Sequence, residues 1–338
     1  MKKFIVLILT FVLVLQAGVV SFAQTEKTGD VDGDGTIAAQ DARLALRLSV
    51  SLDKAAWKVR RYADADGDGE VKAADARLIL RAAVGLDGPE KLADVNLTKP
   101  SFSFYPDLEH GTELRVAEQS SLFAGNVVIR KGDNYTWSSS NPDSVTVDSN
   151  GTITGLTRGF SCVILTVEDE KFYYFVSVQN EIQQKLDALR EKYPDGYYWN
   201  NLTPSERYPD VTETPCPGHL SGDYSTCIGQ CWGFANLISD EVFGKNAPKQ
   251  TGVTAETMKI GDHIRTSHHS VIITDLIQPG EVYGYNFWSG ENIVADSTIV
   301  IVVHCNWGYT CNIMWDYDYT DYIYSYDSIV PQGSYTRY

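Results

Sequence analysis

The chain has 338 residues, which at roughly 100–200 residues per domain predicts two or three domains. It carries 44 acidic and 28 basic residues, and the resulting net charge of −16 disfavours a broad surface for nucleic acid or an anionic membrane. The charged fraction of 21% and the aromatic fraction of 12% argue against a disordered chain.

Residues 1–23 have the three-part pattern of a secretory signal peptide. Two lysines are followed by the apolar run Phe4–Val14, and Ser21 and Ala23 supply the small residues of a cleavage site. A membrane anchor is the alternative, but the run is short, and no other apolar stretch approaches the roughly 20 residues that a span needs. We therefore expect a secreted, extracellular protein without a transmembrane span in the mature chain, in which disulfides can form.

An internal repeat follows, because residues 30–53 and 64–87 align without gaps and share 15 of 24 positions. Each copy has aspartates at positions 1, 3, 5 and 12 of a calcium loop, a turn glycine at position 6, and a backbone carbonyl ligand at position 7. The predicted ligands are Asp30, Asp32, Asp34, Thr36 and Asp41 in the first site and Asp64, Asp66, Asp68, Glu70 and Asp75 in the second. We expect two structural calcium ions and no organic cofactor.

These EF-hand-like loops end in Asp rather than Glu, and no helical pattern precedes the first loop. The duplicated D-x-D-G-D-G loops, each followed by one predicted helix, resemble the dockerin type I module over about residues 28–88. The resemblance implies a small all-α calcium-loop module that binds a cohesin of a scaffoldin or cell-surface protein, as in a cellulosome. It also implies cohesin contacts at loop positions 10 and 11 and at the helix arginines, which are Ala39, Gln40, Ala73, Ala74, Arg43, Arg47, Arg77 and Arg81.

Short alternating stretches replace the helical period from Val95 to Val178. Residues 145–154 indicate a strand, an Asn-Gly turn and a second strand. Together with W-S-S-S-N-P from Trp137 and the apolar stretch 159–167, they resemble the bacterial Ig-like group 2 domain. That resemblance implies an all-β sandwich, which could be a spacer, an adhesin or a carbohydrate binder. We expect Trp137 in its core and find no catalytic chemistry in it.

The remaining 160 residues contain a candidate nucleophile. An amphipathic helix is predicted over 180–193, and a second helix begins near Gln230-Cys231-Trp232 and ends at Gly244. Cys231 therefore lies at a helix N-terminus, where unpaired amides and the helix dipole favour a thiolate over a thiol. This is a typical place for a catalytic thiol.

Two predicted strands carry its possible partners. The strand near residues 267–274 opens with His268 and His269, and the strand from residue 299 ends near Asn306. We favour His269 as the base because it is in phase with Val271 and Ile273, although a one-residue slip would expose His268 to the thiol instead. A helix cysteine that faces a strand histidine, oriented by a polar residue on the next strand, is the geometry of cysteine peptidases.

Gln230-Cys231-Trp232-x-Phe-Ala, Gly261-Asp262, His269-Ser-Val-Ile-Ile and Asn306-Trp resemble the CHAP and NlpC-type papain-like hydrolases. The resemblance implies an α+β domain over 179–338 with nucleophile Cys231, general base His269, orienting residue Asn306 and, beside the nucleophile, the oxyanion candidate Gln230. It implies a peptidase or amidase acting on protein or peptidoglycan. The alternative is a catalytically silent binding module anchored by the dockerin; glycoside hydrolysis is less supported, because no paired carboxylates are evident.

The other cysteines form two local pairs and one single residue. Cys216 and Cys227 flank a loop, and Cys305 and Cys311 bracket an Asn-Trp-Gly turn, so both pairs are predicted disulfides in an exported chain. Cys162 is then unpaired. A zinc site is the rival, drawn from Cys216, His219, Cys227, Cys231, His269, Cys305 and Cys311, but the spacing matches no recognised zinc pattern.

Overall fold

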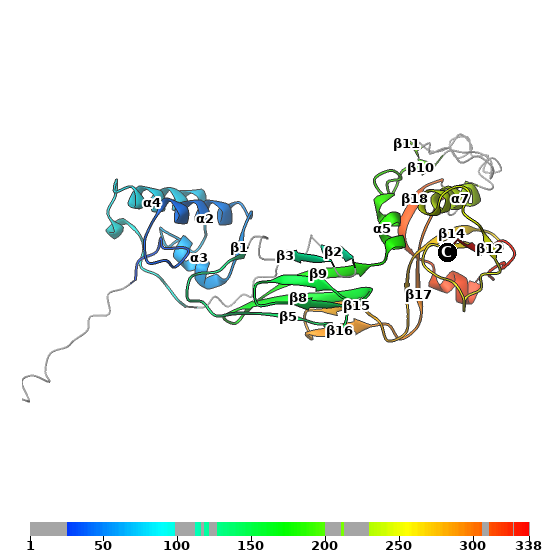
Figure 1. The fold of residues 1–338 in the computed structure, drawn as a ribbon. Helices are drawn as coiled ribbons and strands as arrows, with labels where there is room; N and C mark the ends of the chain where they lie inside the picture. Colours follow the sequence, from blue (N-terminus) through cyan, green and yellow to red (C-terminus); the bar gives the residue numbers. More distant parts are fainter. Residues whose placement is uncertain are drawn as a thin grey trace, which may run out of the picture. The chain divides into compact units, whose positions relative to one another are not determined.

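A computed structural model describes residues 26–98, 112–115, 118–121, 127–199, 211–212, 230–305, 311–326 and 328–337 (Figure 1). The predicted signal peptide lies outside these residues. No helix among the described residues is long and apolar enough to cross a membrane. The chain divides into two compact units: the first holds described residues 26–98, 127–135 and 167–170, and the second holds the other described residues.

The first unit is mainly helical. Its elements are α2 (Ala39–Ser49), β1 (Lys54–Ala55), α3 (Trp57–Ala63), α4 (Ala73–Ala83), the short helix η1 (Pro89–Lys91) and β4 (Val127–Val128), which pairs with β1. Helices α2 and α4 pack on each other and bury Ala45, Leu48 and Ile79. Both helices confirm the sequence prediction. Helix α3 was not predicted, because its seven residues are too few to show a clear helical period, yet it buries Val59 and Ala63.

The second unit begins with two sheets. One has the strand order β2 (Thr112–Arg115), β9 (Glu170–Gln179), β8 (Gly159–Val167) and β5 (Tyr135–Ser139), and the other has β3 (Gln119–Ser121), β7 (Thr152–Gly155) and β6 (Val145–Val147). The predicted hairpin at 145–154 is confirmed, since Val147 pairs with Ile153 in antiparallel strands and Gly151 turns with a φ of 78°. Trp137 packs against the core around Ile153 and Val163, as predicted.

The C-terminal part of this unit combines two helices with a larger sheet. Helices α5 (Glu181–Ala188) and α7 (Gln230–Phe243) accompany a six-stranded sheet in the order β12 (Gln250–Thr251), β19 (Tyr335–Thr336), β13 (His263–Arg265), β14 (Ser270–Ile277), β17 (Ile299–Cys305) and β18 (Ile313–Asp318). The pair β10 (Tyr198–Trp199) and β11 (Val211–Thr212) and the helical turn η5 (Tyr322–Tyr326) complete it. Helix α7 packs on β13, β14 and β17, and Phe234 and Ile238 enter the core that they share.

Helix α5 begins as predicted and ends earlier than predicted. The Asn180 side chain caps it by accepting a hydrogen bond from the Gln183 backbone N–H at 2.9 Å. The helix ends at Ala188 rather than near Tyr193, because the following residues bond three positions back: Leu189 to Leu186 and Arg190 to Asp187. The residues directly after Ala188 therefore form a tight turn instead of a further turn of α-helix.

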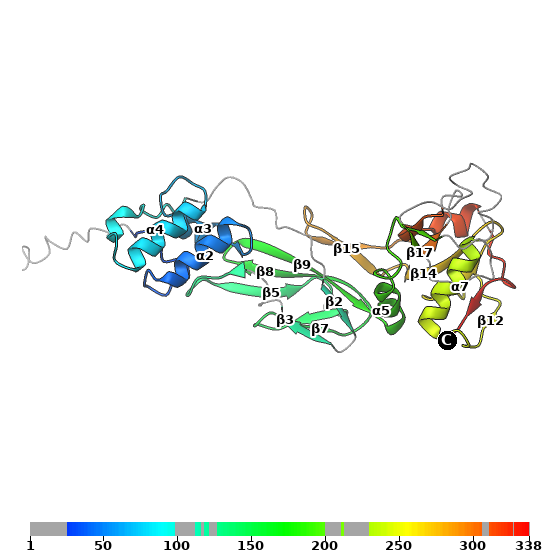
Figure 2. The ribbon, with the colours of Figure 1, turned by 90° about the horizontal axis from the view of Figure 1, so that it is seen from above.

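A hairpin of the C-terminal part packs on the first sheet of this unit. It consists of β15 (Val282–Asn286) and β16 (Glu291–Val294); β15 lies beside β8 in Figure 1, and Figure 2 shows the same hairpin, labelled at β15, from above. Tyr285 is buried in one cluster with Cys162 and Ile164. Phe287 lies 5.0 Å from the Tyr173 ring, measured between ring centroids. The contact makes one continuous apolar core of segments that the sequence assigned to separate domains.

The substitution Tyr285→Ala is expected to lower the free energy of unfolding of this unit by about 2–4 kcal/mol, because it removes a buried aromatic ring. Urea unfolding measures the loss, and limited proteolysis should show faster cleavage in residues 282–294. Trp288→Ala is the matched control, since Trp288 lies in the same hairpin and is 82% exposed. Equal stability of the Tyr285→Ala variant and the natural protein would mean that the hairpin is not held on the sheet.

Candidate functional site

Two groups of carboxylates lie in the repeated loops of the helical module. The oxygens of Asp30, Asp32 and Asp41 that could ligate a cation lie within 4.8 Å of one another, and so do those of Asp64, Asp66 and Asp68. The remaining predicted side-chain ligands are tied to the same loops: Asp34 by hydrogen bonds from Thr36, and Asp75 by hydrogen bonds from Ala65 and Asp66.

Backbone amides hold the first loop in shape. Asp30 Oδ1 accepts from the Gly33 N–H at 2.9 Å, and Asp41 Oδ1 accepts from the Val31 N–H at 2.8 Å. Gly35 has a φ of 93°, a conformation that favours glycine and allows the sharp turn. The second loop repeats these bonds through Asp64 and Asp75. Converging carboxylates on a preformed turn suit a hard cation with oxygen ligands, so both sites fit calcium.

Asp41 and Asp75 also begin the helices that follow the loops. Asp41 Oδ2 accepts from the Ala38 N–H at 2.9 Å, and Asp75 Oδ2 accepts from the Lys72 N–H at 2.7 Å. Both carboxylates are buried at the first turn of α2 and α4, where the helix dipole favours a negative charge. The loop and the helix therefore depend on the same side chain.

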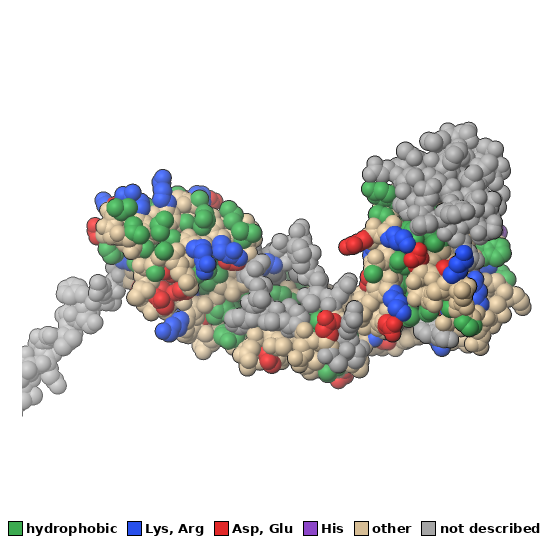
Figure 3. Space-filling view, turned by 45° about the horizontal axis from the view of Figure 1, so that its top comes forward, with side chains coloured by type: hydrophobic (Ala, Val, Ile, Leu, Met, Phe, Trp, Pro, Cys, Tyr) green, Lys and Arg blue, Asp and Glu red, His purple; other side chains and the backbone are tan. Residues whose placement is uncertain are grey.

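The predicted cohesin contacts all lie on the helical module, but two of its arginines already form ion pairs within it. Arg47 pairs with Asp53 at 2.6 Å, and Arg81 pairs with Asp87 at 2.5 Å. The other six predicted contacts are exposed, namely Ala39, Gln40, Arg43, Ala73, Ala74 and Arg77. Apolar side chains are exposed at equivalent positions of the two copies, which sequence reasoning missed: Leu46 and Leu80, Val50 and Val84, Leu52 and Leu86. Hydrophobic and basic side chains lie together on this module in Figure 3.

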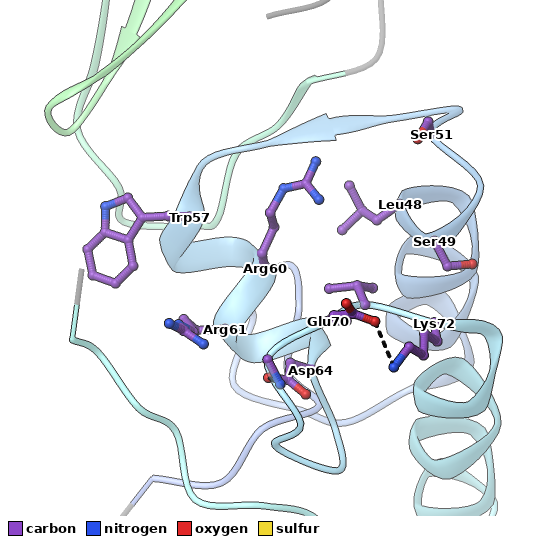
Figure 4. Close-up of a pocket in the computed structure, with 11 residues that line it drawn as sticks. Leu48, Ser49, Ser51, Trp57, Arg60, Arg61, Asp64, Glu70 and Lys72 are labelled. Atoms are coloured by element: carbon purple, nitrogen blue, oxygen red, sulfur yellow. Dashed lines mark hydrogen bonds and ion pairs between the residues drawn. The ribbon is translucent and has the colours of Figure 1, made fainter. Parts of the chain in front are cut away.

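A hollow of about 430 Å³ borders the second calcium loop. Trp57, Arg60 and Arg61 line it from α3, while Leu48 and Ser49 line it from α2 (Figure 4). On the loop side of the hollow, Lys72 Nζ lies 2.8 Å from Glu70 Oε2 and forms an ion pair with it. The pair ties the start of α4 to the loop.

The second unit holds the candidate nucleophile. Cys231 is the second residue of α7 and is 5% exposed. Arg265 Nη1, from the end of β13, lies 4.0 Å from its sulphur. Cys305 from β17 is its buried neighbour: burial raises the pKa of Cys305 well above its usual value, and the charge of Cys231 raises this pKa further. Gln230 opens α7 as predicted, and its side chain lies outside the described structure.

The predicted base is buried beside a second histidine. His269 is 4% exposed, and its Nε2 lies 3.2 Å from Nδ1 of His304, which is fully buried on β17. His268 points to solvent, and its Nδ1 lies 2.7 Å from Ser267 Oγ. Because β14 pairs with β17 through Ile272 and Val303, His269 and His304 are diagonal neighbours on one face of the sheet. His269 is thus buried and His268 exposed, as the favoured register predicts, while the choice of the histidine that faces Cys231 stays a prediction.

Burial governs the charge of both histidines. It lowers the pKa of His269 well below its usual value, and the positive charges of His304 and Arg265 lower this pKa further. It also lowers the pKa of His304 to about 4, partly opposed by the hydrogen bond that the ring donates to the Cys305 backbone. Burial thus favours the neutral form of both rings, so that one imidazole can donate to the other through the Nε2–Nδ1 contact.

His304 is an observed partner of His269 that the sequence analysis did not name. Asn306 lies outside the described residues, so its predicted orienting role stays a prediction. His304 was missed although a signal was present: it lies two residues before Asn306, which puts both on the same face of a strand. The apolar run from Ile299 predicts a buried strand, and a polar partner was expected after the end of that strand rather than at His304 within it.

The Gly261-Asp262 pair has a structural task. A Cβ at Gly261, where φ is 90°, would lie 2.7 Å from the Ile182 side chain. Asp262 is buried and accepts from the Lys259 N–H at 2.8 Å, and burial raises the pKa of its carboxyl to about 6. The pair forms the tight turn that directly precedes β13, the strand that ends at Arg265.

The predicted disulfide between Cys305 and Cys311 is wrong. Cys305 is free and buried, whereas Cys311 is disulfide-bonded. The reason is strand pairing: Cys305 lies opposite Ile313 in the sheet and points into its core. Cys162 is free, as predicted, and burial raises the pKa of its thiol to about 12. The predicted pair Cys216 and Cys227 lies outside the described residues.

The buried state of His304 has a measurable consequence for stability. Its pKa is about 4 in the folded protein and about 6.5 when unfolded, so the unfolded chain takes up the proton first as pH falls. We expect the natural protein to lose about 3 kcal/mol relative to His304→Gln between pH 6.5 and pH 4. Urea unfolding at several pH values measures this difference, with His268→Gln as the exposed control. A difference that does not change with pH would contradict the burial of a neutral His304.

Comparison with known protein families supports the dockerin-like character of the first unit. The Dockerin type I domain model matches residues 28–84, which hold both aspartate loops and helices α2, α3 and α4. This match supports calcium binding and a cohesin-docking component of the cellulosome type, and such components are extracellular. A search of curated proteins gave no match. Among solved structures, a bacterial Ig-like domain-containing GH10 xylanase from termite gut is 16% identical over 25% of this chain and 23% of its own, with a TM-score of 0.20.

Proposed function

We propose that this protein is a secreted enzyme of a cellulosome-type assembly, which docks on a cohesin and hydrolyses peptide or amide bonds through Cys231. The observation that carries the proposal is the buried pair of His269 and His304, on the same sheet on which the helix of Cys231 packs. Strongly perturbed titratable groups cluster at functional sites, and the two imidazoles held 3.2 Å apart, with pKa values lowered by burial, are such a group.

Each residue has a defined task in the proposed reaction. Cys231 attacks the carbonyl carbon, and the backbone N–H of Cys231 is the candidate donor to the oxyanion. His269 takes the thiol proton and gives it to the leaving amine, and cleavage of the C–N bond of the tetrahedral intermediate leaves a thioester on Cys231. His304 orients His269 through Nε2, so that Nδ1 of His269 is the nitrogen that exchanges the proton with the thiol. Water then hydrolyses the thioester and restores the thiol.

Labelling with a thiol electrophile tests this function. Iodoacetamide is expected to modify Cys231 in the folded full-length chain faster than Cys162 and Cys305, as read by mass spectrometry of peptides, because Cys231 is 5% exposed and adjoins Arg265 while the other two are 0% exposed. The same protein is then incubated with casein and with peptidoglycan, and the products are identified by mass spectrometry. If Cys231 reacts no faster than the other two thiols and neither substrate is cleaved, the hydrolase proposal fails and a dockerin-anchored binding module replaces it.

A further inference from the structure

Arg265 stands beside the proposed nucleophile. Its Nη1 lies 4.0 Å from Cys231 Sγ and 3.0 Å from the hydroxyl of Ser270. Its guanidinium carbon is 5.7 Å from the centre of the Trp232 ring, and Trp232 is 46% exposed. A positive charge therefore adjoins both the buried thiol and an indole that reaches solvent.

The backbone and stem of Arg265 are held by the C-terminal turn. Its N–H donates to Ser334 Oγ at 2.8 Å, and its carbonyl accepts from the Val330 N–H at 2.7 Å. Gly333 packs so closely that a Cβ there would lie 2.9 Å from Arg265 Cγ. The guanidinium is thus placed before any ligand arrives, which reduces the entropy that binding would cost.

Arg265 also differs from other arginines of this unit in its partners. Arg158, Arg190 and Arg337 each lie within 2.9 Å of a carboxylate oxygen. In the described part of the chain no carboxylate pairs with Arg265, although the sequence contains 44 acidic residues. Its contacts with Ser270 and Cys231 involve Nη1 alone, and the remaining N–H groups form the fork that matches a carboxylate.

We propose that Arg265 binds a carboxylate of the substrate, so that the preferred amide bond is flanked by an acidic residue or a free carboxyl terminus. A hydrogen bond of about 2.8 Å from one of the remaining guanidinium nitrogens would hold this carboxylate within about 9 Å of the sulphur. One extended residue spans about 3.5 Å, so the carboxylate belongs close to the scissile bond. The inference rests on the proposed hydrolase function and adds the class of substrate.

Matched peptides test the role of Arg265 in the full-length protein. They are built around the bond cleaved in casein or peptidoglycan, and the members of each pair differ only in Glu against Gln beside that bond, or in a terminal carboxylate against a carboxamide. The natural protein is expected to favour the acid by at least about tenfold in kcat/KM. Arg265→Gln should bring this ratio close to one, Arg265→Lys should keep part of it, and the control Arg190→Gln should leave it unchanged.

Two further readings separate the possible outcomes. An equal loss of rate on both members of a pair in Arg265→Gln would mean that Arg265 stabilises the oxyanion instead, which overturns the proposal. Calorimetry on the Cys231→Ala chain measures binding of each peptide without turnover. Acid-selective binding that needs Arg265, in a protein that cleaves nothing, supports the carboxylate site and refutes the hydrolase. Cleavage without an acid preference supports the hydrolase and refutes the carboxylate site.

Discussion

Replacement of Cys231 by alanine is expected to abolish hydrolysis, with a loss of at least about 10⁴-fold in kcat, while the protein stays folded. Alanine lacks the sulphur that forms the thioester, and no other described thiol can take its place, because Cys162 and Cys305 are buried in packed cores. Alanine also suits a helix, so α7 should form unchanged. Product release from casein or peptidoglycan measures activity, and circular dichroism measures the fold.

Substitutions of the histidines should lower the rate of hydrolysis to different extents, depending on what each ring contacts. His269→Ala is expected to be nearly as severe as Cys231→Ala, since the thiol loses its base. His304→Ala should cost less, because it removes an orienting ring rather than a reacting group. His268→Ala is the matched control next in sequence, and its exposed ring predicts little change. Full activity of Cys231→Ala would overturn the hydrolase, and loss of activity in His268→Ala alone would mean that the strand register is wrong.

Local patterns in the sequence predicted those elements that carry their own signals. Helices α2 and α4 follow duplicated loops with buried acidic caps, and the hairpin of β6 and β7 has an Asn-Gly turn. The packing of Tyr285 and Phe287 on the first sheet was missed. The contact joins segments more than 100 residues apart, and the sequence of neither segment indicates the other as its partner. A pattern of alternation predicts a strand but not the surface on which the strand lies.

The candidate site was predictable to the extent that it depends on strand phase. Alternation with Val271 and Ile273 was enough to place His269 rather than His268 inside. Arg265 gave no such signal, since an arginine at the end of a short strand is ordinary until the fold brings it beside Cys231. The wrong disulfide has a similar cause: closeness in sequence suggested Cys305 and Cys311, whereas sheet pairing turned Cys305 into the core.

Removal of calcium is expected to unfold the helical module and abolish cohesin binding, while the larger sheet of the second unit stays folded. Without a cation, three carboxylates whose oxygens lie within 4.8 Å of one another repel each other in each loop. The module has a small core, and each bound ion adds about 2.7 kcal/mol of stability when its concentration is a hundred times the dissociation constant. Loss of helical circular dichroism in excess chelator, with recovery on adding calcium, is the expected observation.

Single substitutions locate this effect in the loops. Asp41→Ala should weaken the module more than Asp32→Ala, because Asp41 is both a ligand candidate and the cap that accepts from the Ala38 N–H at the start of α2. Asp94→Ala is the control, since Asp94 lies outside the loops and pairs with Lys27. Calcium titration by calorimetry and binding to a panel of cohesins measure the two losses. Cohesin binding that persists in excess chelator would contradict a calcium-dependent module, and an equal loss in Asp32→Ala and Asp41→Ala would show that the cap adds nothing beyond the ligand.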